Sequence, residues 1–231
     1  MITEQEFHRI VVYVKDKFGI DLSGKQILVS GRLENYILRH GYGGYDEYMA
    51  KVEKNPKGEE ARNLSNVLTT NHTYFMREFE HFEFMKQKLL PKLKASEAAS
   101  KDLRIWSAAS STGEEAYTIA MVLKDFFGID HHMWDTTVLA TDISTKVLMH
   151  AQRGRYLKEQ IEPLPENWRR KYFKQISPLE YQVKPELKKE VLFRQFNRMN
   201  PFPFRKPFHI VCLRNVMSYF EEKTKVERLN K

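Results

Sequence analysis

The sequence predicts an α/β protein in which an all-helical unit precedes a unit built on a parallel β-sheet. Up to about residue 90, apolar residues recur at helical spacing and no strand pattern interrupts them. From residue 103 onward, strand-like and helix-like stretches alternate, as in βαβ units. The stretch KASEAASKD is small and polar, which is typical of a linker. We therefore predict a helical domain at 1–90, a linker at 91–102 and a second domain at 103–231.

The first helix is predicted over residues 3–18, where apolar residues from Phe7 to Phe18 follow the i, i+3, i+4, i+7 pattern. Thr3 is placed to cap its start and Gly19 to end it. Further helices of this unit are predicted at 25–40, 45–54, 59–70 and 75–94.

Three strands are predicted in the second unit, in LRIWSAA from residue 103, at 136–144 and at 208–216. The last is nearly all apolar in its middle, as a strand buried on both faces would be. Helical stretches follow the first two strands. The turn-rich segment 155–195 is predicted to be an insert with a helix and two or three short strands.

Composition limits the functional classes. The apolar fraction of 42% is enough for a core, and no apolar run approaches the roughly 18 residues of a membrane span. The single cysteine, Cys212, excludes a disulfide framework and fits a reducing cytosol, so a cytoplasmic protein without membrane insertion is expected. The net charge is +8, and residues 145–231 hold 20 basic and 9 acidic side chains. That excess indicates an anionic partner, or only a well-solvated surface.

Two features suggest a nucleoside site. In the turn from Ser107 to Glu115, small residues would let a ligand approach the backbone, and Ser111 with Glu114 matches a capping box. A single glycine and two acidic residues there argue against a diphosphate. Asp142 ends the second predicted strand, where a carboxylate can accept both ribose hydroxyls. An ordinary capped turn, with Asp142 capping the next helix, would explain the same residues.

Two polar clusters could complete that site. Asn71, Thr73 and Arg77 lie close enough in sequence to converge on a polar ligand end, and Arg77 suits a carboxylate. Alternatively, Asn71 and Thr73 cap the helix predicted from Phe75. An Arg214-Asn215 pair lies at the C-terminal edge of the last predicted strand and would face the ligand crevice of a parallel sheet, unless Asn215 caps a helix.

The strings LTTNHTYFMRE, WSAASSTGEEAYTIAM, ATDIS and FHIVCLRNVMSYF, in this order, resemble the CheR family of chemotaxis receptor methyltransferases. The resemblance covers the chain from its first helix to its end. It implies a helical N-terminal domain and a Rossmann-like methyltransferase domain with a small antiparallel β-subdomain. It also implies methyl transfer from S-adenosyl-L-methionine to glutamate side chains of chemoreceptors, with S-adenosyl-L-homocysteine as product and without a metal.

The resemblance also assigns residues. The cofactor contacts carried over by motif are Asn71, Thr73, Arg77, Ala109, Glu115, Asp142, Asn197, Arg198, Arg214 and Asn215. Arg77 and Tyr219 are the catalytic candidates. A sulfonium methyl is already activated and a glutamate with a pKa of about 4.3 is already ionised at neutral pH, so no strong base is needed. The expected partners are the cytoplasmic helices of methyl-accepting receptors, and basic residues of the insert and of the second helix (Lys25, Arg32, Arg39) suit their acidic surface.

Departures from the family leave alternatives. The chain ends at Lys231, where relatives continue with a helix and a final strand pair, so those C-terminal strands are expected to be missing. A non-catalytic S-adenosylmethionine-binding sensor or adaptor is therefore the main alternative. A nucleic-acid methyltransferase is the weaker rival, because Asn200-Pro201-Phe202 precedes the late strand instead of following it, and no nucleic-acid partner is expected. The connection KQISPLEYQVKPEL is short and lacks glycine, so no C-terminal receptor pentapeptide is expected to bind.

Overall fold

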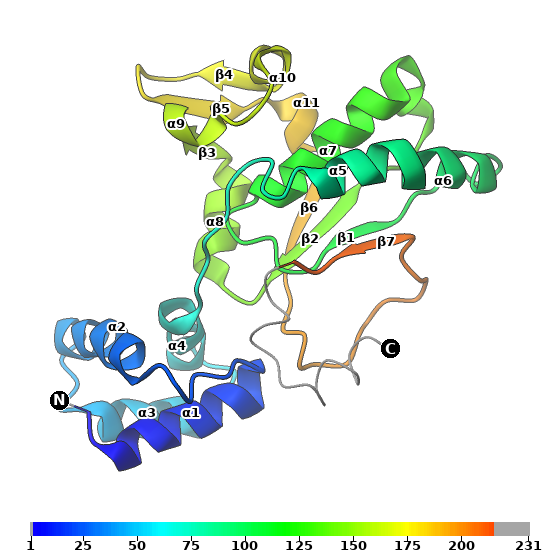
Figure 1. The fold of residues 1–231 in the computed structure, drawn as a ribbon. Helices are drawn as coiled ribbons and strands as arrows, with labels where there is room; N and C mark the ends of the chain where they lie inside the picture. The colour runs from blue at the N-terminus through cyan, green and yellow to red at the C-terminus, as the bar shows by residue number, and fades with distance from the viewer. Residues whose placement is uncertain (1, 215–231) are drawn as a thin grey trace.

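A computed structural model describes residues 2–214 of the chain. Four helices form its first unit (Figure 1): α1 (Glu4–Phe18), α2 (Gln26–Arg39), α3 (Tyr45–Lys54) and α4 (Glu59–Leu68). The predicted ends of α1 are confirmed. Thr3 forms a capping box with Glu6, and Gly19 ends the helix in the left-handed conformation at φ 70°. The core of the unit includes Ile10, Val14, Leu33, Tyr48 and Leu64, all fully buried.

Arg32 of α2 contacts the end of α4. Its guanidinium donates to the backbone oxygens of Leu68 and Thr69 at 3.1 Å each, and of Val67 at 3.5 Å. The last carbonyls of a helix have no partner within the helix, so a guanidinium placed there satisfies them. Arg32 is therefore part of the packing of the helical unit.

We predict that Arg32→Ala lowers the free energy of unfolding by about 1–3 kcal/mol, because partly buried carbonyls lose a charged donor. Urea unfolding of the full chain measures this. Arg39→Ala, an exposed position in the last turn of α2, is the matched control and should change stability little. Equal midpoints for the two variants would contradict this role of Arg32.

A parallel four-stranded sheet forms the centre of the second unit. Its order is β6 (Val191–Gln195), β2 (Val138–Asp142), β1 (Ile105–Ser107) and β7 (Ile210–Cys212). The chain moves outward from β1 through β2 to β6 and then returns to the other side of β1. In an open α/β sheet, this reversal marks the ligand crevice outside the carboxyl ends of the strands. The predicted α/β class with a helical N-terminal unit is confirmed.

The helices of this unit include α7 (Glu114–Phe127), a 3₁₀ turn (Gly128–Met133) and α8 (Thr145–Arg153). The helix predicted over 75–94 is broken. Residues 75–79 form turns, with Met76 and Glu78 at φ of 59° and 50°, and α5 (Glu80–Phe84), a π-helical turn (Met85–Leu89) and α6 (Leu90–Ser96) follow.

The boundary between the two hydrophobic cores lies between Leu68 and Phe75, earlier than the boundary near residue 90 that the sequence predicts. Buried apolar residues up to Leu68 form one cluster, whereas Phe75, Phe82 and Leu90 pack with the core of the second unit. Helix α6 also occupies part of the predicted linker. The segment after α4 therefore packs as part of the second unit because its apolar side chains face that core.

The insert forms a separate three-stranded antiparallel sheet, which lies at the far end of the molecule from the helical unit (Figure 1). Its strands are ordered β3 (Arg155–Leu157), β5 (Glu180–Val183) and β4 (Phe173–Gln175). The short helices around it are α9 (Lys158–Ile161), α10 (Glu166–Tyr172) and α11 (Pro185–Lys188). The predicted end of the insert at 195 is too late, because β6 pairs in parallel with β2 over five residues.

Within residues 2–214, no helix combines the length and the apolar character that crossing a membrane requires. The strand predicted at 208–216 is observed as β7, and its predicted end lies beyond the described residues.

Candidate functional site

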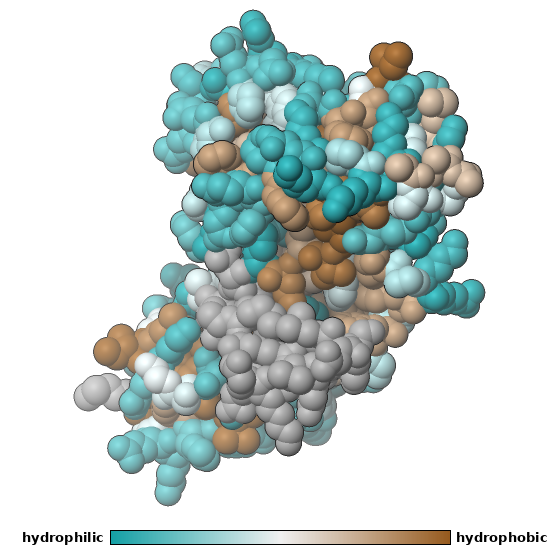
Figure 2. Space-filling model, turned by 45° about the vertical axis from the view of Figure 1, so that its right-hand side comes forward, coloured by the Kyte–Doolittle hydropathy of each residue, from teal (hydrophilic) through white to brown (hydrophobic). Residues whose placement is uncertain are grey.

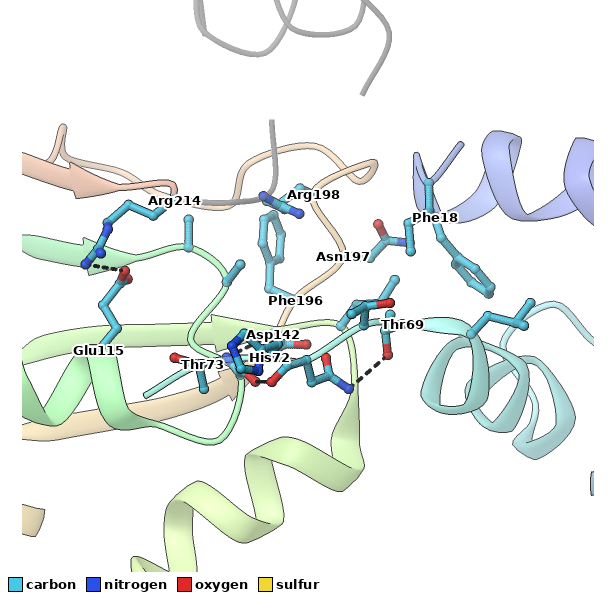
Figure 3. Close-up of a pocket in the computed structure, with 18 of the residues that line it drawn as sticks. Phe18, Thr69, His72, Thr73, Glu115, Asp142, Phe196, Asn197, Arg198 and Arg214 are labelled. Carbon is cyan, nitrogen blue, oxygen red and sulfur yellow. Dashed lines mark hydrogen bonds and ion pairs between the residues drawn. The ribbon is translucent and has the colours of Figure 1, made fainter. Parts of the chain in front are cut away.

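A pocket opens where the carboxyl ends of the parallel strands meet the helical unit (Figure 3). The loops after the strands contribute Ala108, Ala109 and Ser111 (β1), Ile143 (β2), Phe196, Asn197 and Arg198 (β6) and Arg214 (β7), and Asp142 is the last residue of β2 itself. The other wall comes from the helical unit and the segment that leaves it, with Phe18, Ile20, Leu22, Lys25 and residues 68–74. The strand order thus brings four separate stretches of sequence to one place.

Asp142 is the most firmly held polar group in this pocket. Its two carboxylate oxygens accept from the backbone N–H groups of Ser111 and Ser144, each at 2.9 Å. Its exposure is only 8%, and burial raises the pKa of the carboxyl, an effect that the two N–H donors and the charge of Arg198 oppose. The carboxylate is therefore oriented before any ligand arrives.

The turn after β1 differs from the predicted capping box. Helix α7 starts after Gly113, and it is Thr112 whose hydroxyl donates to Glu114, at 2.6 Å. Ser111 has φ 47° and instead donates its hydroxyl to the backbone oxygen of Asn71 at 2.8 Å. Gly113 has φ 99°, and a Cβ there would lie 2.8 Å from that of Ala151, so this turn requires glycine.

Glu115 and Arg214 form a charged pair at the pocket wall. One oxygen of Glu115 accepts from the Ser107 hydroxyl at 2.7 Å, and the other lies 3.4 Å from an Arg214 nitrogen. Burial raises the pKa of Glu115, while Ser107 and Arg214 act in the opposite direction. Arg214 also contacts Glu78 at 3.2 Å and donates to the backbone oxygen of Arg77.

Arg77 lies in the turn segment beside this pair. Its guanidinium donates to the backbone oxygen of His72 at 2.8 Å and lies 5.8 Å from the ring centre of Tyr74. Asn71 donates to the Thr69 hydroxyl at 3.3 Å. Neither Asn71 nor Thr73 caps a helix at Phe75, because α5 starts only at Glu80 with Phe79 before it. The capping alternative for these two residues is therefore wrong.

Asn197 and Arg198 follow β6. The Asn197 amide donates to the backbone oxygen of Lys17 at 2.7 Å, which ties this loop to the end of α1. Burial lowers the pKa of Arg198 to about 10, and the charge of Asp142 opposes this shift.

The structure brings nine of the predicted contacts to this one pocket. They are Asn71, Thr73, Arg77, Ala109, Glu115, Asp142, Asn197, Arg198 and Arg214. Asn215 and Tyr219 lie outside the described residues. The apolar wall of the pocket was not predicted, because nothing in a helical stripe or a loop distinguishes a pocket residue from a core residue. It consists of Phe18, Ile20, Leu22 and Phe196.

The pocket chemistry suits a nucleoside with an amino-acid end. The buried carboxylate of Asp142 can accept hydrogen bonds from a diol. The Glu115 carboxylate suits an ammonium group, and the guanidiniums near it suit a carboxylate. The apolar wall suits a flat base.

Comparisons with known proteins agree with this chemistry. The all-alpha domain of CheR methyltransferases matches residues 5–69, and their SAM-binding domain matches residues 71–231. A chemotaxis protein methyltransferase of Borreliella burgdorferi is 41% identical over all of this chain and 83% of its own length. A chemotaxis protein methyltransferase of Escherichia coli is 33% identical over 100% of the chain and 79% of its own length. One of Listeria innocua is 28% identical over 99% of the chain and 84% of its own length. The chain therefore belongs to the CheR family, the S-adenosylmethionine-dependent chemotaxis protein methyltransferases.

Proposed function

We propose that the pocket binds S-adenosyl-L-methionine and that the chain methylates glutamate side chains on the cytoplasmic helices of chemoreceptors. The observation that carries this proposal is the Asp142 carboxylate, which two backbone N–H groups orient at the carboxyl end of β2. A carboxylate in that position can accept from both ribose hydroxyls.

The amino-acid end of the cofactor fits the part of the pocket around Glu115 and Arg214. We assign its ammonium group to Glu115 and its carboxylate to the guanidiniums of Arg77 and Arg214. A guanidinium can hold a carboxylate through two parallel hydrogen bonds. Asn71, Thr73, Ala109, Asn197 and Arg198 complete the proposed contacts, and Asn215 is a further candidate from the family resemblance.

The reaction requires little acid–base catalysis by the protein. The bound cofactor supplies a methyl group activated by its sulfonium. A receptor glutamate with an unperturbed pKa of about 4.3 is already an anion at neutral pH. The residues around Arg77 therefore have to orient that carboxylate and exclude water. We propose Arg77 and Tyr219 for this role.

The receptor side of the proposal rests on charge. The insert with the three-stranded antiparallel sheet is mostly hydrophilic on the face that Figure 2 shows. Its exposed basic side chains include Arg155, Lys158, Lys171 and Lys174. Acidic, glutamate-rich receptor helices would complement such a surface. The link between β4 and β5 is residues 176–179, and we propose that it docks no receptor pentapeptide. A titration with that peptide would detect binding if this proposal is wrong.

The decisive experiment is transfer of a labelled methyl group from S-adenosylmethionine to intact receptor, with base-labile glutamyl esters as the product. Label on receptor glutamates is the expected result. Cofactor binding without transfer would support the sensor alternative, and salt-sensitive incorporation into DNA or RNA would support the nucleic-acid alternative.

We predict that affinity for S-adenosylhomocysteine falls as the solution is acidified from neutral pH. The pKa of Asp142 is raised by burial, and only its ionised form can accept from both ribose hydroxyls. Affinity should therefore be full above this raised pKa and fall as the pH drops through it, by up to about tenfold per pH unit. Calorimetric titrations over this range measure the effect. If the affinity of Asp142→Ala fell with pH as steeply as that of the unmodified chain, the pH dependence would belong to another group.

A further inference from the structure

The two residues that hold the Asp142 carboxylate are both hydrogen-bonded to α4 or to the segment that follows it. Ser144 and Ser111 donate their backbone N–H groups to Asp142 at 2.9 Å each. Both serines are buried, with exposures of 0% and 8%. Their hydroxyl groups point away from Asp142 to partners that lie more than 30 residues earlier in the sequence. The geometry of Asp142 therefore depends on contacts made outside the sheet.

Asn66 of α4 makes the larger set of these contacts. Its side-chain oxygen accepts from the Ser144 hydroxyl at 2.8 Å and from the backbone N–H of Lys146 at 3.4 Å. Its amide nitrogen donates to the Thr145 hydroxyl at 3.3 Å. Ser144 is itself the N-cap of α8. Asn66 thus extends the cap of α8 from a different unit, and Figure 1 shows α4 below the amino-terminal end of α8.

The second contact comes from the segment that leaves α4. The Ser111 hydroxyl donates to the backbone oxygen of Asn71 at 2.8 Å. Asn66 and Asn71 stand on either side of the end of α4 at Leu68. Asn66 of α4 and Asn71 of the segment that follows it therefore contact the two serines, and they are only five positions apart.

We propose that Asn66 is a positioning residue for the cofactor, because it fixes Ser144 and through Ser144 the carboxylate of Asp142. Docking of α4 against α8 then sets the geometry of the ribose site. This inference rests on the proposed cofactor site at Asp142. A side-chain amide suits the task, since its oxygen and nitrogen serve an acceptor and a donor role at once.

The expected effect of Asn66→Ala is a rise of about tenfold in the dissociation constant for S-adenosylhomocysteine, the size of one lost hydrogen bond to a buried group. The KM for S-adenosylmethionine should rise by a similar factor while kcat changes little, because Asn66 touches no reacting group. Asn66→Asp keeps the oxygen that faces Ser144 and should keep most of the affinity.

The matched control is Asn63→Ala, one turn earlier on α4. The Asn63 amide donates to the Tyr36 hydroxyl at 2.8 Å within the helical unit, so its loss affects that unit but not α8. Asn63→Ala should bind S-adenosylhomocysteine like the unmodified chain. Equal weakening in both variants would show a general effect of α4 and overturn the proposal.

A double-mutant cycle in the full chain, with S-adenosylhomocysteine as the probe in calorimetry, tests the route through Ser144. Asn66→Ala and Ser144→Ala remove opposite ends of one hydrogen bond, so their effects should not add. Additive effects, or unchanged affinity in Asn66→Ala, would overturn the coupling. Asp142→Ala separates this inference from the cofactor site: unchanged affinity there overturns both, whereas a loss there with normal Asn66→Ala overturns the coupling alone.

Discussion

Replacement of Asp142 by alanine is expected to weaken S-adenosylhomocysteine binding by more than about 100-fold. A hydrogen bond to a charged group contributes about 1.5–3 kcal/mol, and the carboxylate would accept two from the ribose. The two together exceed about 2.7 kcal/mol, which corresponds to about 100-fold in the dissociation constant. The effect is large because the backbone N–H groups of Ser111 and Ser144 already orient the carboxylate, so little is lost in ordering it when the ligand binds.

Calorimetry on the purified chain measures this loss. Asp135→Ala is the matched control, because Asp135 is an exposed aspartate near the amino end of β2 and Asp142 is at its carboxyl end. The substitution at 142 also leaves two backbone donors without their acceptor, so the thermal stability of the ligand-free variant has to be compared in parallel. A folded Asp142→Ala chain that binds as tightly as Asp135→Ala would contradict the ribose assignment.

Replacement of Arg77 by alanine is expected to lower kcat/KM for receptor methylation by about 100-fold or more. The guanidinium lies in the pocket wall, held by the backbone oxygen of His72 at 2.8 Å. In that position it can orient a carboxylate of the cofactor or of the incoming glutamate, and alignment of reacting groups is the main task in this transfer. Arg77→Lys should recover only a small part of the activity, since an ammonium cannot form the two parallel hydrogen bonds of a guanidinium.

Steady-state rates of methyl transfer to intact receptor measure this effect. Arg62→Ala provides a close control, because Arg62 also donates to a backbone oxygen five residues earlier, that of Lys57, at 2.8 Å, but lies on α4 outside the pocket. Normal kcat/KM in both Arg77 variants would remove Arg77 from the reaction site. Measurement of S-adenosylhomocysteine affinity in the same variants tells whether Arg77 acts on the cofactor or on the glutamate.

Local sequence patterns predicted the helices and strands well where the residues that end an element are close to it in sequence. The capping box of Thr3 and the left-handed Gly19 set the ends of α1 with residues close in sequence. The apolar run before Asp142 predicted β2, and the alternation of strands and helices predicted a parallel sheet. A parallel sheet in turn implies that the residues after its strands meet at one edge, which is why Glu115, Asp142 and Arg198 lie around one pocket.

The sequence was less informative where two distant segments compete for the same group. The repeat of apolar residues after Phe75 predicted one long helix, but those side chains pack on the core of the second unit and the first residues form turns instead. Ser111 was predicted to pair with Glu114, three residues further along the chain, but its hydroxyl donates to the backbone oxygen of Asn71. Nothing in the sequence around Arg32 indicated that its guanidinium donates to the backbone oxygens at the end of α4.

Most element types, the position of the polar residues at the carboxyl edge of the sheet and the family of the chain could therefore be predicted from the sequence alone. These follow from short-range periodicity, from turn chemistry and from ordered motifs, all of which are properties of neighbouring residues. The contact of Asn66 with the cap of α8, and the apolar side chains that the end of α1 and the loop after it contribute to the pocket, emerged only from the three-dimensional packing. Such contacts join residues up to 180 positions apart, and their energy depends on how the two units pack, which no local pattern encodes.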